Sequence, residues 1–224
     1  MMIKNKIFIA CDTKSIKKVQ KIIKNTTTDK FKVGYKFGLE FFNSKNGRSF
    51  ISKIKKKITF IDLKLCDIPN TCISTIKAIK DLKINYLTIH ISSGFDALKA
   101  SKKACGKIKL IGVTTLTSLN EKHLKQIGYN KSLNNLVIHQ AKLASKAMLD
   151  GIVCSPHEVK NVKKIFKGEI ITPGIRFNSK FNDQKRVMTP KQALKNGSDW
   201  LVIGRPITKG NIKNNLKKLL KVIN

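Results

Sequence analysis

The sequence predicts an α/β fold, a (β/α)₈ TIM barrel that forms a single domain over residues 1–224. Short apolar runs alternate with amphipathic helical patterns along the chain, and this alternation favours parallel strands joined by helices. Eight such runs in 224 residues match the strand count and length of a closed barrel. A doubly wound open sheet is the alternative, but a glycine-rich turn normally follows its first strand, and here Ala10–Thr13 follows instead.

The eight strands are expected at the apolar runs. They cover Lys6–Cys11, Lys30–Gly34, Ile58–Lys64, Asn85–His90, Lys107–Val113, Asp150–Cys154, Glu169–Thr172 and Asp199–Ile203. An apolar stripe at three-residue steps predicts a helix between two of them. Its members are Ile73, Ile76, Ile79 and Leu82. Thr71 is expected to cap this helix, and two more amphipathic helices are expected over Leu133–Met148 and Ile212–Val222.

The net charge of +33 is the most unusual bulk property of the chain. Such an excess would normally suggest nucleic acid or an anionic membrane as a partner. However, nearly all of it is lysine spread from end to end, together with abundant isoleucine and asparagine, as expected of an AT-rich genome. The longest basic run, Lys55–Lys57, is short and has no interleaved aromatic residues for base stacking. A solvated lysine-rich surface is therefore expected, with no nucleic-acid or membrane partner.

The sequence favours a cytoplasmic protein. No apolar run approaches the ~18 residues of a membrane span. The apolar stretch Ile7–Cys11 is short and lacks a small-residue cleavage site, so it is interpreted as the first strand rather than a signal segment. The five cysteines are odd in number and lack CxxC spacing, which favours reduced thiols over disulfides or a zinc site.

The third predicted strand carries two opposite charges. Alternate residues of a strand face the same side, so Asp62 and Lys64 point together. Ile61, Leu63 and Leu65 point the other way, toward the helices, which leaves the two charges inside the barrel. Charges there are costly unless they are paired, and at the C-terminal ends of barrel strands they usually serve catalysis. For this pair alone, a structural ion pair remains the alternative.

Other charges are expected near the same mouth. Asp12 and Lys32 lie near the ends of the first two predicted strands, and Asp67 lies just beyond the third. Alternating signs would let each charge offset the desolvation of its neighbour. Carboxylates beside Lys64 favour its charged ammonium form, which suits a proton donor better than a Schiff-base nucleophile.

The stretch Asp62–Thr71, with the sequence DLKLCDIPNT, resembles the D-x-K-x-x-D-I-P-N-T signature of the orotidine 5′-phosphate decarboxylase family. A bare D-x-K-x-x-D also occurs in barrels that act on ketose phosphates, so the continuation is the specific part. It consists of Ile68, Pro69, Asn70 and Thr71. Further matching segments run in the family's order from Ile9 to Thr208. One departure is Cys66, where many members carry histidine.

The resemblance implies cofactor-free decarboxylation of orotidine 5′-monophosphate to UMP, the last step of UMP synthesis, with no metal site. It implies that Lys64 faces the ring carbon C6 and protonates it, while Asp62 lies against the substrate carboxylate. Lys32 would orient Asp62 and the ribose, Asp12 would bind ribose hydroxyls, and Thr117 would lie near the pyrimidine and ribose.

Asp67 is implied to act in the neighbouring subunit's site. A homodimer with shared active sites, binding a small-molecule substrate, is therefore expected.

The phosphate of the substrate is expected at the loops after the seventh and eighth strands, the usual phosphate site of such barrels. Arginine is scarce in this chain, and these loops carry Arg176 and the pair Gly204–Arg205. Arginine forks bind phosphate oxygens through paired, charge-assisted hydrogen bonds. The polar stretch Phe177–Val187 is long enough to be a lid, from which the resemblance implies that Gln184 reaches the phosphate.

Two other functions are alternatives to this one. A ketose-phosphate decarboxylase or aldolase on the same barrel would be expected to require Mg²⁺ for an enediolate. A basic RNA- or membrane-associating protein on an inactive barrel is a second possibility, although keeping Asp62, Lys64, Asp67 and Arg205 together speaks against lost activity.

Overall fold

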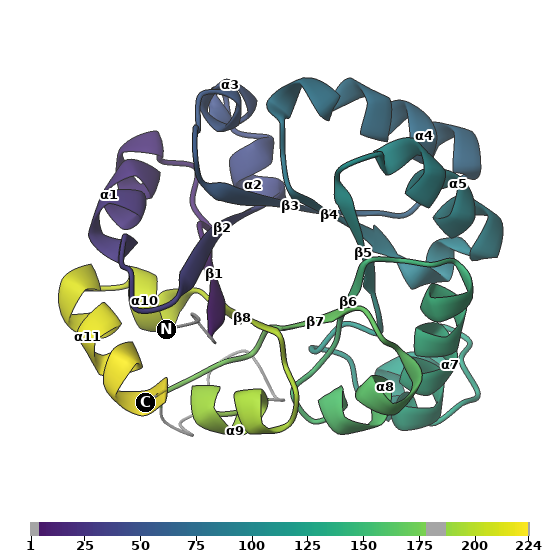
Figure 1. The fold of residues 1–224 in the computed structure, drawn as a ribbon. Helices are drawn as coiled ribbons and strands as arrows, with labels where there is room; N and C mark the ends of the chain where they lie inside the picture. The colour runs from purple at the N-terminus through teal and green to yellow at the C-terminus, as the bar shows by residue number, and fades with distance from the viewer. Residues whose placement is uncertain (1–4, 178–186, 224) are drawn as a thin grey trace.

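The computed structural model describes residues 5–177 and 187–223, and its strands form a closed, all-parallel barrel (Figure 1). The strands pair in sequence order, and the last one closes onto the first. They are β1 (Lys6–Ala10), β2 (Lys32–Gly38), β3 (Ile58–Leu65), β4 (Tyr86–His90), β5 (Lys109–Val113), β6 (Gly151–Val153), β7 (Glu169–Thr172) and β8 (Trp200–Ile203). The predicted (β/α)₈ barrel is confirmed.

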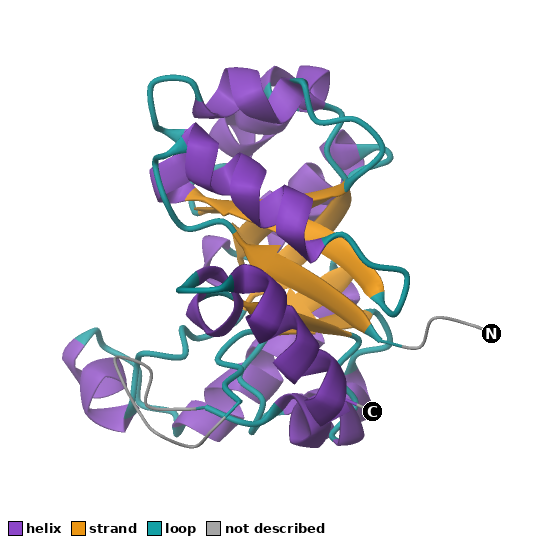
Figure 2. Cartoon of the chain, turned by 90° about the vertical axis from the view of Figure 1, so that its left-hand side faces the viewer, coloured by secondary structure: helices purple, strands orange, loops and turns teal. Residues whose placement is uncertain are grey.

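Helices surround the barrel on its outer side (Figures 1 and 2). They are α1 (Ile16–Thr26), α2 (Leu39–Phe42), α3 (Gly47–Ser52), α4 (Pro69–Ala78), η1 (Lys80–Leu82), η2 (Ile91–Ser93), α5 (Phe95–Cys105), α6 (Glu121–Gln126), α7 (Leu133–Lys146), α8 (Val159–Ile165), α9 (Pro190–Lys195), α10 (Arg205–Thr208) and α11 (Ile212–Ile223). The cap expected at Thr71 is wrong, because α4 already begins at Pro69. Proline suits that first position, since its missing N–H has no partner there anyway.

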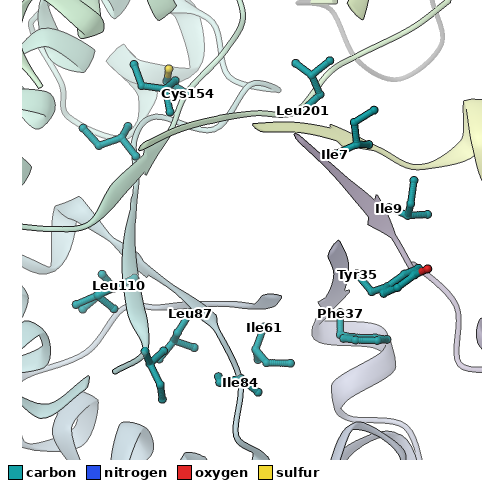
Figure 3. Close-up of a cluster of buried hydrophobic side chains, with 14 of the residues drawn as sticks. Ile7, Ile9, Tyr35, Phe37, Ile61, Ile84, Leu87, Leu110, Cys154 and Leu201 are labelled. Atoms are coloured by element: carbon teal, nitrogen blue, oxygen red, sulfur yellow. The ribbon is translucent and has the colours of Figure 1, made fainter. Parts of the chain in front are cut away.

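The core has two layers, as the alternation of side chains along each strand requires. The outer layer fills the space between strands and helices, and Figure 3 shows members such as Ile7, Ile9 and Leu201 pointing away from the barrel centre. The inner layer fills the barrel. Its buried members are Phe8, Ala10, Phe60, Tyr86, Ile111, Ile171, Trp200 and Val202.

Aromatic rings fill much of the inside of the barrel. The rings of Phe8 and Trp200 stack with centroids 4.0 Å apart. Gly34 is needed beside them, because a Cβ atom there would lie 2.5 Å from a ring carbon of Phe8. The inward positions of β1 and β3 change from apolar to charged farther along the chain. Polar side chains beyond Ala10 and Phe60 therefore lie above an apolar floor.

In the part of the chain that the structure describes, no helix is long and apolar enough to span a membrane. All five cysteines are free thiols, and four of them are buried.

Candidate active site

A cavity of about 260 Å³ opens at the C-terminal ends of the strands. Six charged side chains are among its lining residues: Asp12, Lys36, Asp62, Lys64, Arg176 and Arg205. Thr117 and Gly204, both expected in the site, line it as well. Gln184 lies outside the described residues. Because β3 and β7 lie on opposite sides of the barrel, Lys64 and Arg176 approach the cavity from opposite sides (Figure 1).

The lysine that β2 contributes is Lys36, and the expectation for Lys32 is wrong. Lys32 is the first residue of β2, pairs with Lys6 and is exposed at the N-terminal end of the barrel. The strand continues to Gly38 instead of ending at Gly34. At ~3.3 Å per residue, this places Lys32 about 13 Å back along the strand from Lys36. The two lysines share the inward face of β2, but only Lys36 reaches the mouth.

Lys36, Asp12, Asp62 and Lys64 form a chain of alternating charges. The Nζ atom of Lys36 lies 3.2 Å from Oδ1 of Asp12 and 3.2 Å from Oδ2 of Asp62. The Nζ atom of Lys64 lies 3.0 Å from the same Oδ2 atom of Asp62. The side chains of Lys36 and Asp62 are each only 11% exposed, so their pairing offsets a large desolvation cost.

The pairing keeps both buried groups charged. Burial alone would lower the pKa of Lys36, but the carboxylates of Asp62 and Asp12 outweigh it and raise that pKa above its ordinary value. Burial alone would raise the pKa of Asp62, but the ammonium groups of Lys36 and Lys64 lower it instead. At neutral pH the site therefore holds Asp62 as a carboxylate and Lys36 as an ammonium ion.

The backbone of β3 is irregular where it carries these charges. Its register against β4 shifts between Ile61 and Leu65, so that three β3 residues lie opposite the single β4 residue Thr88. Within this bulge Lys64 has a φ of 52°, in the left-handed region that residues other than glycine seldom occupy. Bulges often re-aim side chains next to active sites. Here the bulge accompanies a 3.0 Å contact between the charged ends of Asp62 and Lys64.

The arginine side of the cavity is built from the loops after β7 and β8. Gly174 has a φ of 77°, which glycine adopts readily and which turns the chain toward the cavity after β7. The amide of Arg176 then donates to the carbonyl of Met188 at 3.1 Å. This bond ties together the two described ends on either side of residues 178–186. Arg205 follows Gly204 at the start of α10, directly after β8.

The loop after β5 brings Thr117 to the rim. Two buried threonines and Gln140 of α7 hold the first residues of this loop in place. The side-chain oxygen of Gln140 accepts from the Thr115 amide at 2.9 Å. The hydroxyl of Thr114 donates to the carbonyl of Val153 at 2.9 Å. These hydrogen bonds fix the position of the first residues of the loop that carries Thr117.

The D-I-P-N-T stretch lies beside the cavity rather than in it. It comprises Asp67, Ile68, Pro69, Asn70 and Thr71, and none of these described residues lines the cavity. The Asp67 carboxylate accepts from the Ile68 amide at 2.7 Å and is exposed. Ile68 is 66% exposed, which is unusual for a large apolar side chain.

Among the described residues, the sequence analysis missed Lys36 in the cavity and Thr88 behind it, whose hydroxyl accepts from the Lys64 amide at 2.8 Å. Lys36 could have been found from the alternation along β2, because Tyr35 and Phe37 form an apolar face while Lys36 lies between two glycines on the other. Thr88 gives no such signal. A threonine inside a strand is an ordinary β-branched residue, and only the three-dimensional contacts distinguish it.

The cavity combines two kinds of binding surface. One side offers a carboxylate held between ammonium groups, above an apolar floor. The other side offers two arginines, whose planar forks match phosphate oxygens. Among the lining residues that the structure describes, four cations against two carboxylates favour a polyanionic ligand. In the described part of the chain, no group of three or more His, Cys, Asp or Glu side chains could hold a metal ion.

Known proteins match this chain over nearly its whole length. The model of the orotidine 5′-phosphate decarboxylase / HUMPS family matches residues 5–219. An orotidine 5′-phosphate decarboxylase from Wolbachia sp. subsp. Brugia malayi is 45% identical, covering 96% of this chain and 97% of that protein. One from Wigglesworthia glossinidia brevipalpis is 42% identical, covering 97% of each.

Solved structures agree as well. The crystal structure of orotidine 5′-phosphate decarboxylase from Lactobacillus acidophilus superposes with a TM-score of 0.84 at 30% identity, covering 98% of this chain and 99% of that one. The Methanocaldococcus jannaschii enzyme complexed with inhibitor BMP shares the fold, with a TM-score of 0.79 at 24% identity and 99% of each chain covered. The matched family model and these relatives extend over nearly the whole chain, so the protein belongs to the orotidine 5′-phosphate decarboxylase / HUMPS family.

Proposed function

We propose that the protein is a carboxy-lyase that converts orotidine 5′-monophosphate to UMP, the last step of UMP synthesis, without a metal or organic cofactor. The observation that carries this proposal is the carboxylate of Asp62, held 3.2 Å from the ammonium of Lys36 and 3.0 Å from that of Lys64 in a cavity with arginines on its other side. The 40–49% identity to proteins named orotidine 5′-phosphate decarboxylase supports this substrate.

Lys64 is the proton donor in this proposal. Loss of CO₂ leaves an electron pair at C6 of the pyrimidine, and the ammonium of Lys64 stabilises that charge before delivering a proton to C6. Asp62 holds the ammonium in place and lies against the substrate carboxylate, whose negative charge passes to C6 as neutral CO₂ leaves. Asp67 is the remaining proposed catalytic carboxylate.

Lys36 takes the role that the sequence analysis gave to Lys32. It bridges Asp12 and Asp62. It therefore orients both Asp62, which lies next to the proton donor, and Asp12, which is proposed to bind ribose hydroxyls. Thr117 lies near the pyrimidine and ribose.

The remaining proposed contacts in this subunit hold the phosphate. Arg176 and Arg205 bind the phosphate, with backbone at Gly204 close by, and Gln184 is a further proposed phosphate ligand. Binding energy gained there is used at the ring, since the phosphate takes no part in the bond changes.

The alternative, a Mg²⁺-dependent ketose-phosphate decarboxylase or aldolase, has less support. An enediolate-stabilising cation needs oxygen ligands that face it, and carboxylates are the usual choice. Asp12 and Asp62 instead direct oxygens at the ammonium of Lys36, within 3.2 Å.

The activity is tested by adding orotidine 5′-monophosphate to purified protein stripped with EDTA and following the loss of orotate absorbance. The expected result is turnover that EDTA does not reduce, together with no release of CO₂ from a ketose phosphate. Turnover of the ketose phosphate only after Mg²⁺ is restored would overturn the proposal in favour of the alternative.

We also propose that the protein acts in the cytoplasm as a homodimer with shared active sites. Five free thiols suit a reducing compartment. The exposed Ile68 and Asp67 beside the cavity suit a surface that a second copy covers, so that Asp67, with Ile68, Pro69, Asn70 and Thr71, completes the partner's site.

A further inference from the structure

We propose that Thr88 is a positioning residue, whose hydroxyl fixes the proton donor Lys64 relative to Asp62 across the bulge in β3. This inference rests on the proposed decarboxylase function. Thr88 lies in the middle of β4, is completely buried and does not line the cavity. Its side chain therefore acts on the reaction only through the two charged residues that it contacts.

One hydroxyl serves both charged residues. The Thr88 hydroxyl accepts a hydrogen bond from the backbone amide of Lys64 at 2.8 Å. The same hydroxyl donates to Oδ1 of Asp62 at 3.0 Å. A hydroxyl has one proton to give and lone pairs to accept with, so it can make both bonds at once. The backbone of the proton donor and the carboxylate beside it are thereby connected through a single atom.

The bulge makes this connection necessary. Ile61 pairs with Leu87 and Leu65 pairs with Ile89, so the β3 residues between the two pairs have only Thr88 opposite them. The amide of Lys64 lies in this unpaired stretch, and a buried amide without a partner is unfavourable. The Thr88 side chain supplies that partner and stabilises the left-handed φ of 52° at Lys64.

The two oxygens of Asp62 are used differently. Oδ2 faces the ammonium groups of Lys36 and Lys64, at 3.2 and 3.0 Å. Oδ1 accepts from Thr88, which fixes the rotation of the carboxylate about its last bond. Without the hydroxyl, the carboxylate could rotate and the Lys64 backbone could relax toward a less strained conformation. Displacements of about 1 Å at a reacting group can reduce turnover by about 100-fold.

The test compares Thr88→Val with Thr88→Ser. Valine keeps the branched shape and removes both hydrogen bonds, while serine keeps the hydroxyl. For Thr88→Val we expect kcat to fall by at least about 10-fold with KM for orotidine 5′-monophosphate and affinity for UMP within about 3-fold, because no cavity wall changes. For Thr88→Ser we expect kcat within about 3-fold of the wild type. If the valine variant does not fold, Thr88→Ala is measured with the same expectation.

Thr59→Val is the matched control. Thr59 is also buried, and its hydroxyl donates to Asn85 Oδ1 at 3.3 Å, but it lies at the opposite end of β3. It should lower the unfolding temperature without changing kcat. An equal kcat loss in Thr59→Val, or no rescue by serine, would reduce Thr88 to a structural role and overturn the inference. A Thr88→Val enzyme as fast as the wild type would do the same. If the wild-type enzyme has no turnover, the proposed function fails first.

Discussion

The carboxylate of Asp62 lies between two ammonium groups, and burial decides what each of these charges contributes. Removing one partner of a buried ion pair leaves the other charge without compensation, which typically costs about 3–5 kcal/mol. The charges here are interdependent, since Lys36 is shared by Asp12 and Asp62 while Asp62 is shared by Lys36 and Lys64. A substitution at any of them should therefore disturb more than one contact.

The two lysines of β2 give a sharp comparison. We expect Lys36→Ala to reduce kcat by about 10²–10³-fold, because it removes a preorganised cation and releases two carboxylates. Lys32→Ala should leave kcat within about 2-fold and stability within about 0.5 kcal/mol, as for other exposed positions. The measurement is steady-state turnover on variants whose circular dichroism matches the wild type. If Lys32→Ala abolished activity while Lys36→Ala left it unchanged, the site would have been assigned to the wrong lysine.

The sequence contains most of the site but not its geometry. The period-two alternation around Asp62 is enough to place Asp62 and Lys64 on one face, and the structure has them together in the cavity. The wrong choice of Lys32 has a physical cause, since Gly34 was interpreted as the end of a strand when it is the small residue that accommodates Phe8. The contact of Thr88 with both charged residues depends on a bulge, which local sequence does not reveal.

At the N-terminal end of the barrel, the side chain of Glu169 connects five strands. Glu169 at the start of β7 accepts from Tyr86 of β4 and Lys109 of β5, both at 3.0 Å. It also accepts from Lys6 of β1 at 3.4 Å and from the indole of Trp200 of β8 at 3.3 Å. Burial would raise the pKa of Glu169, but hydrogen bonding and charge, from Lys109 first, lower it instead.

Glu169→Gln should therefore destabilise the fold in a pH-dependent way. The folded-state pKa of Glu169 is below the unfolded value of ~4.3, so its contribution is complete above that pH and is lost as pH falls through the folded-state pKa. We expect a loss of about 1–3 kcal/mol at pH 7 that shrinks below about pH 4, measured by urea denaturation. The exposed Glu121→Gln is the control and should change little. A destabilisation that stays constant down to acid pH would contradict the assigned charge state.

Element bounds show where sequence patterns were sufficient. β7 matches its predicted range, and the other strands agree to within a few residues, because each apolar run is bounded by polar residues or turns. The helix α4 ends at Ala78, and Ile79 and Leu82 of the predicted stripe are buried around the turn η1 instead. Spacing of three residues fits a 3₁₀ turn as well as an α-helix, so the pattern could not separate the two.

The net charge and the assembly of the molecule both bear on its function. A net charge of +33 attracts a nucleotide that carries a phosphate and a carboxylate, and such steering weakens as salt increases. The exposed Asp67 and Ile68 lie beside the cavity rather than in it, and this is the surface that a second subunit is proposed to cover.

Mixing two inactive variants tests the proposed shared sites. Lys64→Ala and Asp67→Ala homodimers should each be inactive, whereas a mixed dimer contains one site with both wild-type residues. We expect about a quarter of the wild-type activity in an equal mixture after complete subunit exchange, as random pairing makes half of the dimers mixed with one intact site each. A mixture that stays inactive after demonstrated exchange would place Asp67 in its own subunit's site or outside catalysis.

The most direct test of the account is the turnover of Lys64→Ala with orotidine 5′-monophosphate, measured beside its affinity for UMP. Because the ammonium supplies both the proton and the charge that faces C6, kcat should fall by at least about 10³-fold while UMP still binds through the arginine side of the cavity. Turnover within tenfold of the wild type in this folded, UMP-binding variant would contradict the role of Lys64 as the proton donor.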